Sequence, residues 1–154
     1  MNKLTYYIDR GLHTYDPLLE YTVPSIEKDE MLARQLCTYH ILQGRQYELL
    51  ANEMNGKEEE LTLKDLGENP KQTDERSYDP VHGIPVEFRK VLYPGSAGNT
   101  ANTYLNTIKV DRHWDVLRYL TKDAVEIPGF GKMRVTSTEI DEDRSCYVIY
   151  VDEE

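Results

Sequence analysis

Hydrophobic and polar residues alternate along several short stretches of this chain, and a two-residue period of this kind predicts β-strands. The stretches are rich in Tyr, Thr, Val and Leu, and Gly, Pro, Asn or Asp residues bound most of them. We therefore expect strands at residues 3–9, 19–23, 86–93 and 104–110.

Two further stretches repeat their hydrophobic residues at helical spacing. One runs from Met31 to Tyr39, with Ser25 as a candidate N-cap and Gly44 as a natural stop. The other follows Asp111, which can also cap a helix. Both stripes predict helices that pack one face on the core.

A β-hairpin is expected at residues 45–65, after the first helix. A two-residue Asn55-Gly56 turn would leave the leucines of the two strands on different faces. A three-residue loop at 54–56 would set Leu49 opposite Leu61 and make one face apolar. The pattern therefore favours the three-residue loop, with Gly56 left-handed and a bulge.

A second hairpin is expected at residues 132–151, after the second helix. When Leu49 is laid on Val135, Glu53 falls on Glu139, and the order of elements repeats. Few aligned residues are identical, so a duplication and a single continuous sheet remain as alternatives.

These elements predict an α+β fold, in which two helices pack on a mostly antiparallel sheet. The chain is expected to form one domain over residues 1–154, because roughly 68–70% of the unfolded surface can be buried at this length. In the duplicated form it would consist of two pseudo-symmetric ββαββ halves, residues 1–68 and 84–154. The polar segment 69–83 would link them.

The chain is acidic, with 28 Asp and Glu against 18 Lys and Arg and a formal net charge of −10. This balance argues against a general nucleic-acid binder and against attraction to anionic membranes. No stretch approaches 18 apolar residues, and no secretion signal is recognisable at the N-terminus. We therefore expect a cytoplasmic protein whose Cys37 and Cys146 are buried, reduced thiols.

Acidic residues gather near the tips of both hairpins. These are Glu58, Glu59 and Glu60 in the first hairpin, and Asp141, Glu142 and Asp143 in the second. A negative surface of this kind would suit a basic protein partner. The alternative is that solvated tips protect the strand edges and keep the protein soluble.

The last strand, residues 146–151, is apolar on both faces. Such a strand needs cover on both sides. One interpretation is a central strand of the folded chain. The other is a contact in which Tyr147 and Tyr150 meet a protein partner or the second copy of a homodimer.

A small-ligand pocket is the main alternative to a protein-binding site. The loop at residues 95–103 has the glycines and small polar residues that can approach a phosphate, but it lacks the ending of a P-loop. The candidate pocket residues are Ser96, Asn99, Thr100, His82 and His113.

No histidine pair has the spacing of a helical zinc site and no Cys-x-x-Cys is present, so we expect neither a metal nor a cofactor. The sequence favours a non-enzymatic interaction module, an adaptor or inhibitor with acidic hairpin tips and a Tyr-rich surface. The alternatives are a ligand-binding or hydrolytic domain with a pocket between the halves, and a structural homo-oligomer.

Overall fold

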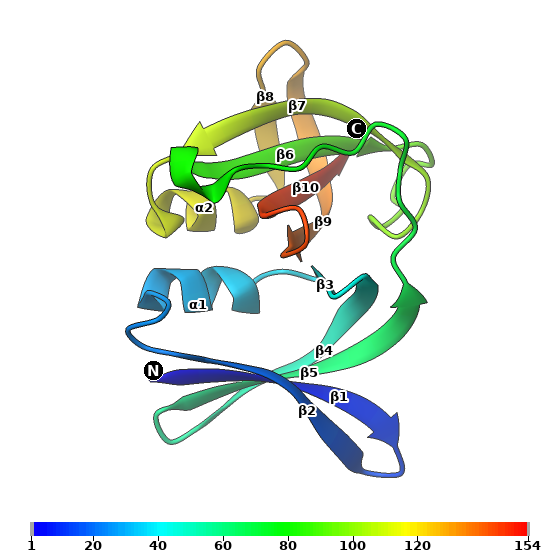
Figure 1. The fold of residues 1–154 in the computed structure, drawn as a ribbon. Helices are drawn as coiled ribbons and strands as arrows, with labels where there is room; N and C mark the ends of the chain where they lie inside the picture. The colour runs from blue at the N-terminus through cyan, green and yellow to red at the C-terminus, as the bar shows by residue number, and fades with distance from the viewer. Residues whose placement is uncertain (1, 154) are drawn as a thin grey trace.

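The structure is a computed structural model that describes residues 2–153. Two α-helices and ten strands build a small α+β fold around one mixed sheet (Figure 1), in agreement with the predicted fold class. The end residues Met1 and Glu154, which the expected domain bounds include, lie outside the described residues.

The first half of the chain contains five strands and one helix. They are β1 (Lys3–Gly11), β2 (Thr14–Thr22), α1 (Lys28–Gln35), β3 (Tyr39–Leu42), β4 (Arg45–Asn55) and β5 (Glu58–Glu68). These strands lie in the order β2-β1-β5-β4-β3, and β1 runs parallel to β5.

The second half contains the same succession of elements after a short 3-10 helix at Pro80–His82. They are β6 (Ile84–Val91), β7 (Asn102–Val110), α2 (His113–Leu120), β8 (Ala124–Ile127), β9 (Gly131–Asp141) and β10 (Cys146–Asp152). The strands lie in the order β7-β6-β10-β9-β8, with β6 parallel to β10. Each half is therefore ββαβββ, with one strand more than the sequence predicted.

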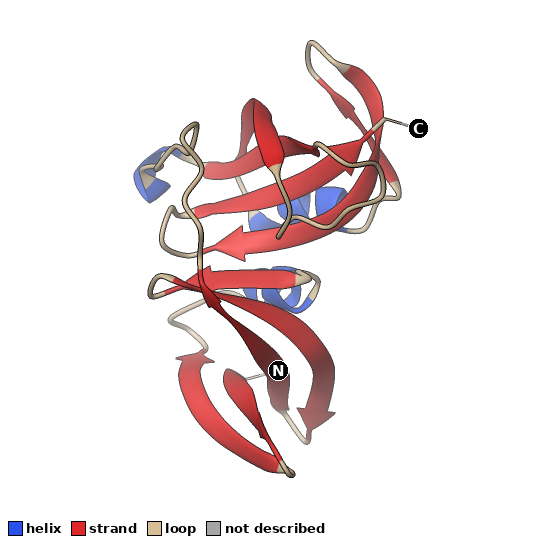
Figure 2. Ribbon diagram, turned by 90° about the vertical axis from the view of Figure 1, so that its right-hand side faces the viewer, coloured by secondary structure: helices blue, strands red, loops and turns tan. Residues whose placement is uncertain are grey.

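The two halves are joined into one sheet by a parallel ladder between β3 and β9, in which His40 pairs with Ile140. Strand β8 pairs with the opposite end of β9, around Met133. In Figure 1 the first half lies below the second, and α1 and α2 lie one above the other where the halves meet. Figure 2 shows that both helices cover the same side of the strands.

The first helix is shorter than predicted, because a strand follows it. The helical stripe was expected to continue to Gly44, but residues 39–42 form β3, and all four side chains are buried. Pairing with β4 on one side and with β9 on the other outweighs the local helical spacing of these residues. The helices begin after Glu27 and Arg112, not after the predicted caps.

The expected turn of the first hairpin was wrong. Asn55 pairs with Glu58 across a two-residue turn, and Leu49 lies opposite Leu63 rather than Leu61. The register shift lies further along, at Leu50, where the ladder is irregular. One face of the hairpin is nevertheless apolar, because the irregularity restores the alternation that the turn alone would have broken.

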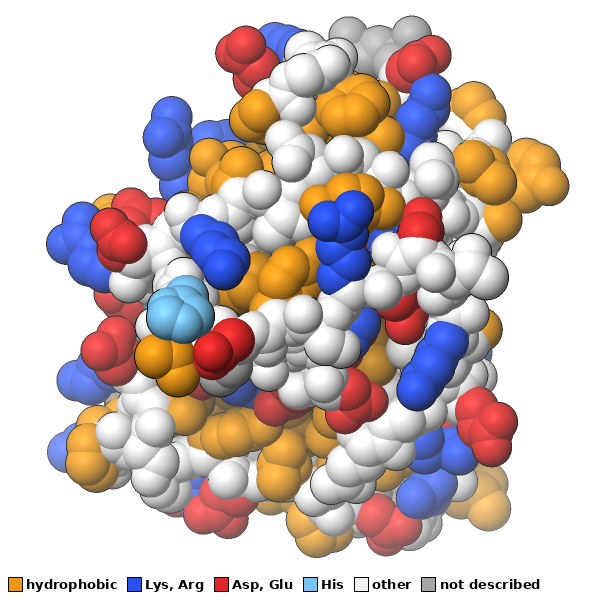
Figure 3. Space-filling model, turned by 45° about the horizontal axis from the view of Figure 1, so that its top comes forward, with side chains coloured by type: hydrophobic (Ala, Val, Ile, Leu, Met, Phe, Trp, Pro, Cys, Tyr) orange, Lys and Arg blue, Asp and Glu red, His pale blue; other side chains and the backbone are white. Residues whose placement is uncertain are grey.

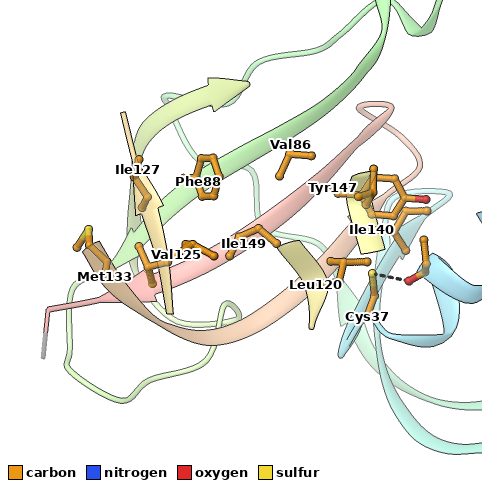
Figure 4. Close-up of a cluster of buried hydrophobic side chains, with 13 residues drawn as sticks. Cys37, Val86, Phe88, Leu120, Val125, Ile127, Met133, Ile140, Tyr147 and Ile149 are labelled. Carbon is orange, nitrogen blue, oxygen red and sulfur yellow. Dashed lines mark hydrogen bonds between the residues drawn. The ribbon is translucent and has the colours of Figure 1, made fainter. Parts of the chain in front are cut away.

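Two hydrophobic cores lie under the helices. The first-half core gathers Met31 of α1 against Leu4, Tyr6, Leu61 and Leu63. The second-half core is drawn in Figure 4, and it also includes Ala33 of α1 and Cys37, which follows that helix. Because α1 takes part in both cores, the halves share hydrophobic contacts as well as a sheet.

Residues 69–83 were expected to be a free linker, but much of this segment lies against the second half. Figure 1 shows it crossing in front of β6. Tyr78 donates a hydrogen bond to Glu87 and its hydroxyl contacts that of Thr107 at 2.7 Å. Tyr78 also packs on a small cluster that contains Val148 and Tyr150 of β10.

This cover explains why the last strand is apolar on both faces. Strand β10 lies between β9 and β6. Tyr147 and Ile149 face the core under α2, while Val148 and Tyr150 face the segment that contains Tyr78. The strand is therefore a central strand of the folded chain.

Candidate functional site

A cavity of about 320 Å³ lies at the junction of the two halves. Both helices, the start of β6 and the β9–β10 turn contribute to its wall. Its polar lining includes Glu30, Arg34, His113, Glu142 and Ser145, and Tyr147 forms part of its apolar lining. These residues come from segments far apart in the sequence.

Arg34 of α1 is the central charge of this site. Its Nη1 lies 2.8 Å from Oε1 of Glu142, and its Nη2 lies 3.1 Å from Oε2 of Glu30. It also donates a hydrogen bond to the hydroxyl of Tyr6, and its guanidinium lies 4.2 Å from the ring centroid of Tyr21. Arg34 is thereby held in place by partners from both halves.

His113 opens α2 and forms the second wall of the site. Its Nε2 lies 3.5 Å from Oε1 of Glu30, and its ring packs edge-on against Tyr147 at 5.8 Å between centroids. Burial lowers the pKa of His113, although the Glu30 charge acts in the opposite direction. The imidazole is therefore predominantly neutral at neutral pH.

Negative charges outnumber positive charges at this site. Glu30 and Glu142 share the single charge of Arg34, and the nearby Asp141 is bonded to Arg144. Within residues 2–153, Oε2 of Glu142 has no hydrogen-bond partner. The junction is therefore an electronegative environment beside an apolar wall.

Tyr147 adds an unpaired polar group to this apolar wall. Its side chain is only 3% exposed, and its hydroxyl has no hydrogen-bond partner among the described residues. Figure 4 shows the ring lying beside Ile140 and close to α1. A buried hydroxyl of this kind costs free energy unless it gains a partner.

A second polar constellation lies on the opposite side of the sheet, beneath residues 69–83. Glu87 is fully buried and accepts bonds from Arg89 and Arg144, both at 2.6 Å. Arg89 also bonds Asp74, and Arg144 bonds Asp141. This network pairs its charges internally, which suits a structural role.

Glu139 borders this network and carries the most perturbed carboxyl of the molecule's interior. Burial and the charge of Asp141 raise its pKa to about 8, against the hydrogen bond that Tyr150 donates at 3.0 Å. The group is therefore largely protonated at neutral pH in the folded protein.

The acidic tip of the second hairpin is used inside the molecule. Glu142 bonds Arg34 and Tyr21 of the first half. Asp143 accepts bonds from the backbone N–H groups of Gln43 and Gly44 at 2.9 and 2.8 Å. Asp141 is 2% exposed and bonds Arg144. The tip that was expected to face a partner therefore holds the two halves together.

The other expected partner residues divide between interior and surface. Tyr147 and Tyr150 are 3% and 5% exposed, so neither presents its ring to a partner in this structure. The sequence-based argument for a homodimer through the last strand therefore loses its support. Around the first tip, Glu58, Glu59 and Glu60 are half-buried, and Glu58 is 3.2 Å from Lys3.

The structure does not bring the candidate pocket residues together. His113 lines the junction cavity, whereas Asn99 and Thr100 lie near Tyr150, on the opposite side of the sheet. His82 is exposed and lies 3.7 Å from Asp79. Ser96 is half-buried in the same loop as Asn99. Only His113 therefore contributes to the cavity between the halves.

Sequence reasoning missed the roles of Glu30, Arg34 and Glu142 at the junction. Glu30 and Arg34 are four residues apart on a helix, which is a recognisable ion-pair spacing. That spacing usually marks a solvated surface pair. Nothing local indicated that Glu142, from the other half, would complete the group.

Comparison with protein-family models, with curated proteins and with solved structures finds no match for this chain. Among residues 2–153, no helix is long and apolar enough to cross a membrane. Within the same residues, no three His, Cys, Asp or Glu side chains form a group that could hold a metal ion.

Proposed function

We propose that this protein binds a small molecule with a cationic group in the junction cavity. The observation that carries the proposal is the convergence of Glu30, His113 and Glu142 around one cavity from three distant segments. The volume of about 320 Å³ is at the lower end of the range for small-molecule sites.

A cationic ligand suits the site better than an anionic one. An N–H donor on the ligand would give the unpaired Oε2 of Glu142 a partner. An anion would instead be repelled by Glu30 and Glu142. These two carboxylates already share the single positive charge of Arg34. The apolar wall of Ile84 and Ile140 would hold the hydrocarbon part of the ligand.

Binding fits the site better than the hydrolytic alternative. The Cys146 thiol is buried, and burial raises its pKa well above its ordinary value, so it is a poor nucleophile. His113 lies beside Glu30 and packs on Tyr147. Covalent hydrolysis commonly uses a serine or cysteine side chain that is hydrogen-bonded to a histidine. Among the described residues that line the cavity, no serine or cysteine has this arrangement.

Titration of the isotope-labelled protein with small amines and size-matched carboxylates tests the proposal. The panel contains putrescine, ethanolamine and agmatine against succinate and acetate. We expect amine-dependent shifts at His113 and Ser145, and about tenfold weaker binding in Glu142→Gln from the lost ion pair. Glu126→Gln, an exposed carboxylate on β8, is the matched control. Equal binding of carboxylates, or no binding by any amine, would contradict the proposal.

Protein binding through the acidic first hairpin is the second candidate function, as the sequence suggested. The observation that favours it is an uncovered sheet face. Glu58 and Glu60 lie on the side of β5 opposite α1, and no described segment crosses that side. The partner would be basic, because the hairpin is strongly acidic.

We also propose that the two halves arose by duplication. The shared ββαβββ order, the parallel β1–β5 and β6–β10 pairs and the otherwise antiparallel neighbours within each half support this origin. The junction cavity would then lie at the interface between two copies of one ancestral unit. A cytoplasmic location remains our proposal, and the two free, buried cysteines are compatible with a reducing compartment.

A further inference from the structure

His40 of β3 has a buried imidazole at the boundary between the two halves. Its backbone pairs with Tyr47 of β4 on one side and with Ile140 of β9 on the other, so His40 belongs to the ladder that joins the halves. Its side chain is fully buried, and neither ring nitrogen has a hydrogen-bond partner among the described residues. A neutral imidazole has one donor and one acceptor, so the ring is already under-satisfied in this position.

The groups around His40 would not neutralise a protonated ring. From β1, Tyr6 packs edge-on against it, with 5.2 Å between the ring centroids. From α1, Arg34 supplies a positive charge that opposes protonation, and Cys37 after that helix has a buried thiol. The cross-strand neighbour on β4 is another tyrosine, Tyr47. A proton on His40 would therefore add a second positive charge to that of Arg34.

The carboxylates of the junction already have other partners. Glu142 on the β9–β10 turn and Glu30 of α1 both pair with Arg34. Glu30 also lies 3.5 Å from the ring of His113. Within residues 2–153, His113 therefore has a carboxylate beside its ring, whereas no carboxylate bonds the ring of His40.

Burial is the main reason that the pKa of His40 falls to about 3, and the charge of Arg34 lowers it further. The backbone of Cys37 acts in the opposite direction, but its effect is the smallest of the three. The protein surface is a different environment. Figure 3 shows acidic and basic side chains interspersed on the face of the second half, where solvent screens their charges. The His40 ring can hold a proton only if water or a counter-charge reaches it.

Backbone hydrogen bonds cross the boundary on both sides of His40. The N–H of Thr38 donates to the carbonyl of Thr138 at 3.0 Å, and the N–H of Glu142 donates to the carbonyl of Ile41 at 2.8 Å. His40 therefore lies within the set of bonds that must break when the two halves separate.

We propose that His40 is an acid sensor, whose protonation opens the β3–β9 ladder and weakens the coupling between the halves. The charged ring gains water only when the ladder parts, because the closed structure places a cation near it and bonds no carboxylate to it within the described residues. The junction cavity has walls from both halves, so the opening would dismantle it as well. The opening does not require a ligand in that cavity.

The direction of the pH effect follows from the two states of the ring. Where the ladder is open, the hydrated ring takes up a proton below its ordinary pKa of 6.5, while in the closed form it stays neutral down to about 3. The ratio of open to closed molecules should therefore rise about tenfold per pH unit between about pH 6 and 5. Glu139 changes stability in the opposite sense over this range, so the wild type is compared with a His40 variant at each pH.

Amide hydrogen exchange of the full-length protein, corrected for the intrinsic pH dependence of exchange, measures the opening at pH 7 and pH 5. We expect the protection of amides that bond across the boundary, those of Thr38 and Glu142 among them, to fall about 25-fold. Protection in β5 and at the centre of β10 should fall less than about threefold, because these strands lie away from the boundary. The imidazole signals of His40 in the isotope-labelled protein should stay those of a neutral ring while the ladder is closed.

Two variants separate His40 from the other titrating groups. His40→Phe keeps a ring in the core but cannot gain a proton, so its boundary protection should agree at the two pH values within about threefold. His13→Asn removes an exposed histidine at a left-handed position of the β1–β2 turn, which Asn tolerates, and should keep the full pH effect. If the core does not accept phenylalanine, the imidazole titration of the wild type decides the question.

Other results would overturn the proposal. Unchanged boundary protection between pH 7 and pH 5 would show that no opening takes place. A loss in His40→Phe as large as in the wild type would assign the effect to other groups. Titration of the His40 ring near pH 6.5 with the ladder intact would show that the closed structure accommodates the charge. Equal loss of protection in β5, in β10 and at the boundary would indicate global unfolding rather than opening of the junction.

Discussion

At the scale of single residues, the buried carboxyls have opposite roles according to their partners. Asp152 accepts bonds from Arg134 and from the backbone N–H of Gly95, and these bonds hold its pKa below its ordinary value. Among the described residues, the Glu139 carboxyl accepts a side-chain hydrogen bond only from the Tyr150 hydroxyl, so burial dominates and its pKa rises to about 8. The first carboxyl stabilises the fold as an anion, whereas the second stabilises it when it is protonated.

Glu139 should make stability fall as the pH rises. In the unfolded chain its side chain loses its proton near 4.5, the ordinary pKa of glutamate, while in the folded protein it keeps the proton to about 8. Between these values the folded state binds the extra proton, so stability decreases by at most about 1.4 kcal/mol per pH unit. Glu139→Gln should remove this slope. The unfolding free energy of the variant, compared with that of the wild type, should therefore be more favourable at pH 8 than at pH 5. Urea unfolding at both pH values measures it, and an unchanged slope would contradict the assignment.

Asp143 should stabilise the contact between the two halves. Its carboxylate accepts bonds from the N–H groups of Gln43 and Gly44. Asp143→Ala removes both bonds, but water can reach these exposed groups, so the expected loss is about 1 kcal/mol of unfolding free energy. Glu126→Ala, which removes an exposed carboxylate elsewhere, should change stability little. Equal effects of the two variants in denaturant unfolding would argue against a specific link.

At the scale of elements, a close approach at Gly98 helps to hold the loop 95–101 on the sheet. The N–H of Gly98 donates to the Ser137 hydroxyl at 2.9 Å, and a Cβ at Gly98 would overlap Cε2 of the Tyr150 ring. Only glycine allows the backbone to lie this close to the ring. The loop thus serves as part of the cover over β10, which is a structural alternative to the phosphate cradle considered from the sequence.

Gly98→Ala should displace this loop. The ring of Tyr150 is buried and cannot move away freely, so we expect a loss of about 1–3 kcal/mol, as for other overpacked sites. Amide exchange should become faster in residues 95–102 before it changes elsewhere. Thr103→Ala, at an exposed position beside the loop, is the control and should be close to neutral. A stable variant with unaltered exchange would show that the loop tolerates the side chain.

Element prediction succeeded where the local pattern and the tertiary contacts agree. The alternating stretches marked β1, β6 and β7 to within a few residues. Polar and apolar side chains alternate along these strands, although both faces of β6 are buried. Strands β3 and β8 were missed, since each has only four residues and directly follows a helix. Their identity depends on pairing with β4 and β9, which a local pattern does not contain.

At the scale of the whole molecule, the two halves meet through backbone, side chains and core together. Strand β3 pairs with β9, and the N–H of Glu142 donates to the carbonyl of Ile41 at 2.8 Å. The ion pair of Arg34 with Glu142 crosses the same boundary, and α1 contributes Ala33 to the core of the second half. Separating the halves would expose all of these groups at once.

The protein should therefore unfold in one cooperative transition. We expect amide protection in β5 and β10, the central strands of the two halves, to disappear at the same urea concentration. Hydrogen exchange monitored by mass spectrometry across a urea series measures this. Loss of protection in β5 while β10 remains protected would show that the junction is too weak to couple the halves.

The sequence by itself determined the α+β class, both helices, most of the strands and the burial of both cysteines. Alternation, helical spacing and turn residues act over a few positions, and they are written directly in the chain. Only the tertiary structure decided the use of the acidic tip of the second hairpin, the cover over β10 and the gathering of Glu30, His113 and Glu142. These depend on contacts between residues far apart in sequence, such as Arg34 with Glu142. Geometry and burial fix such contacts, and a local pattern of residue types does not contain them.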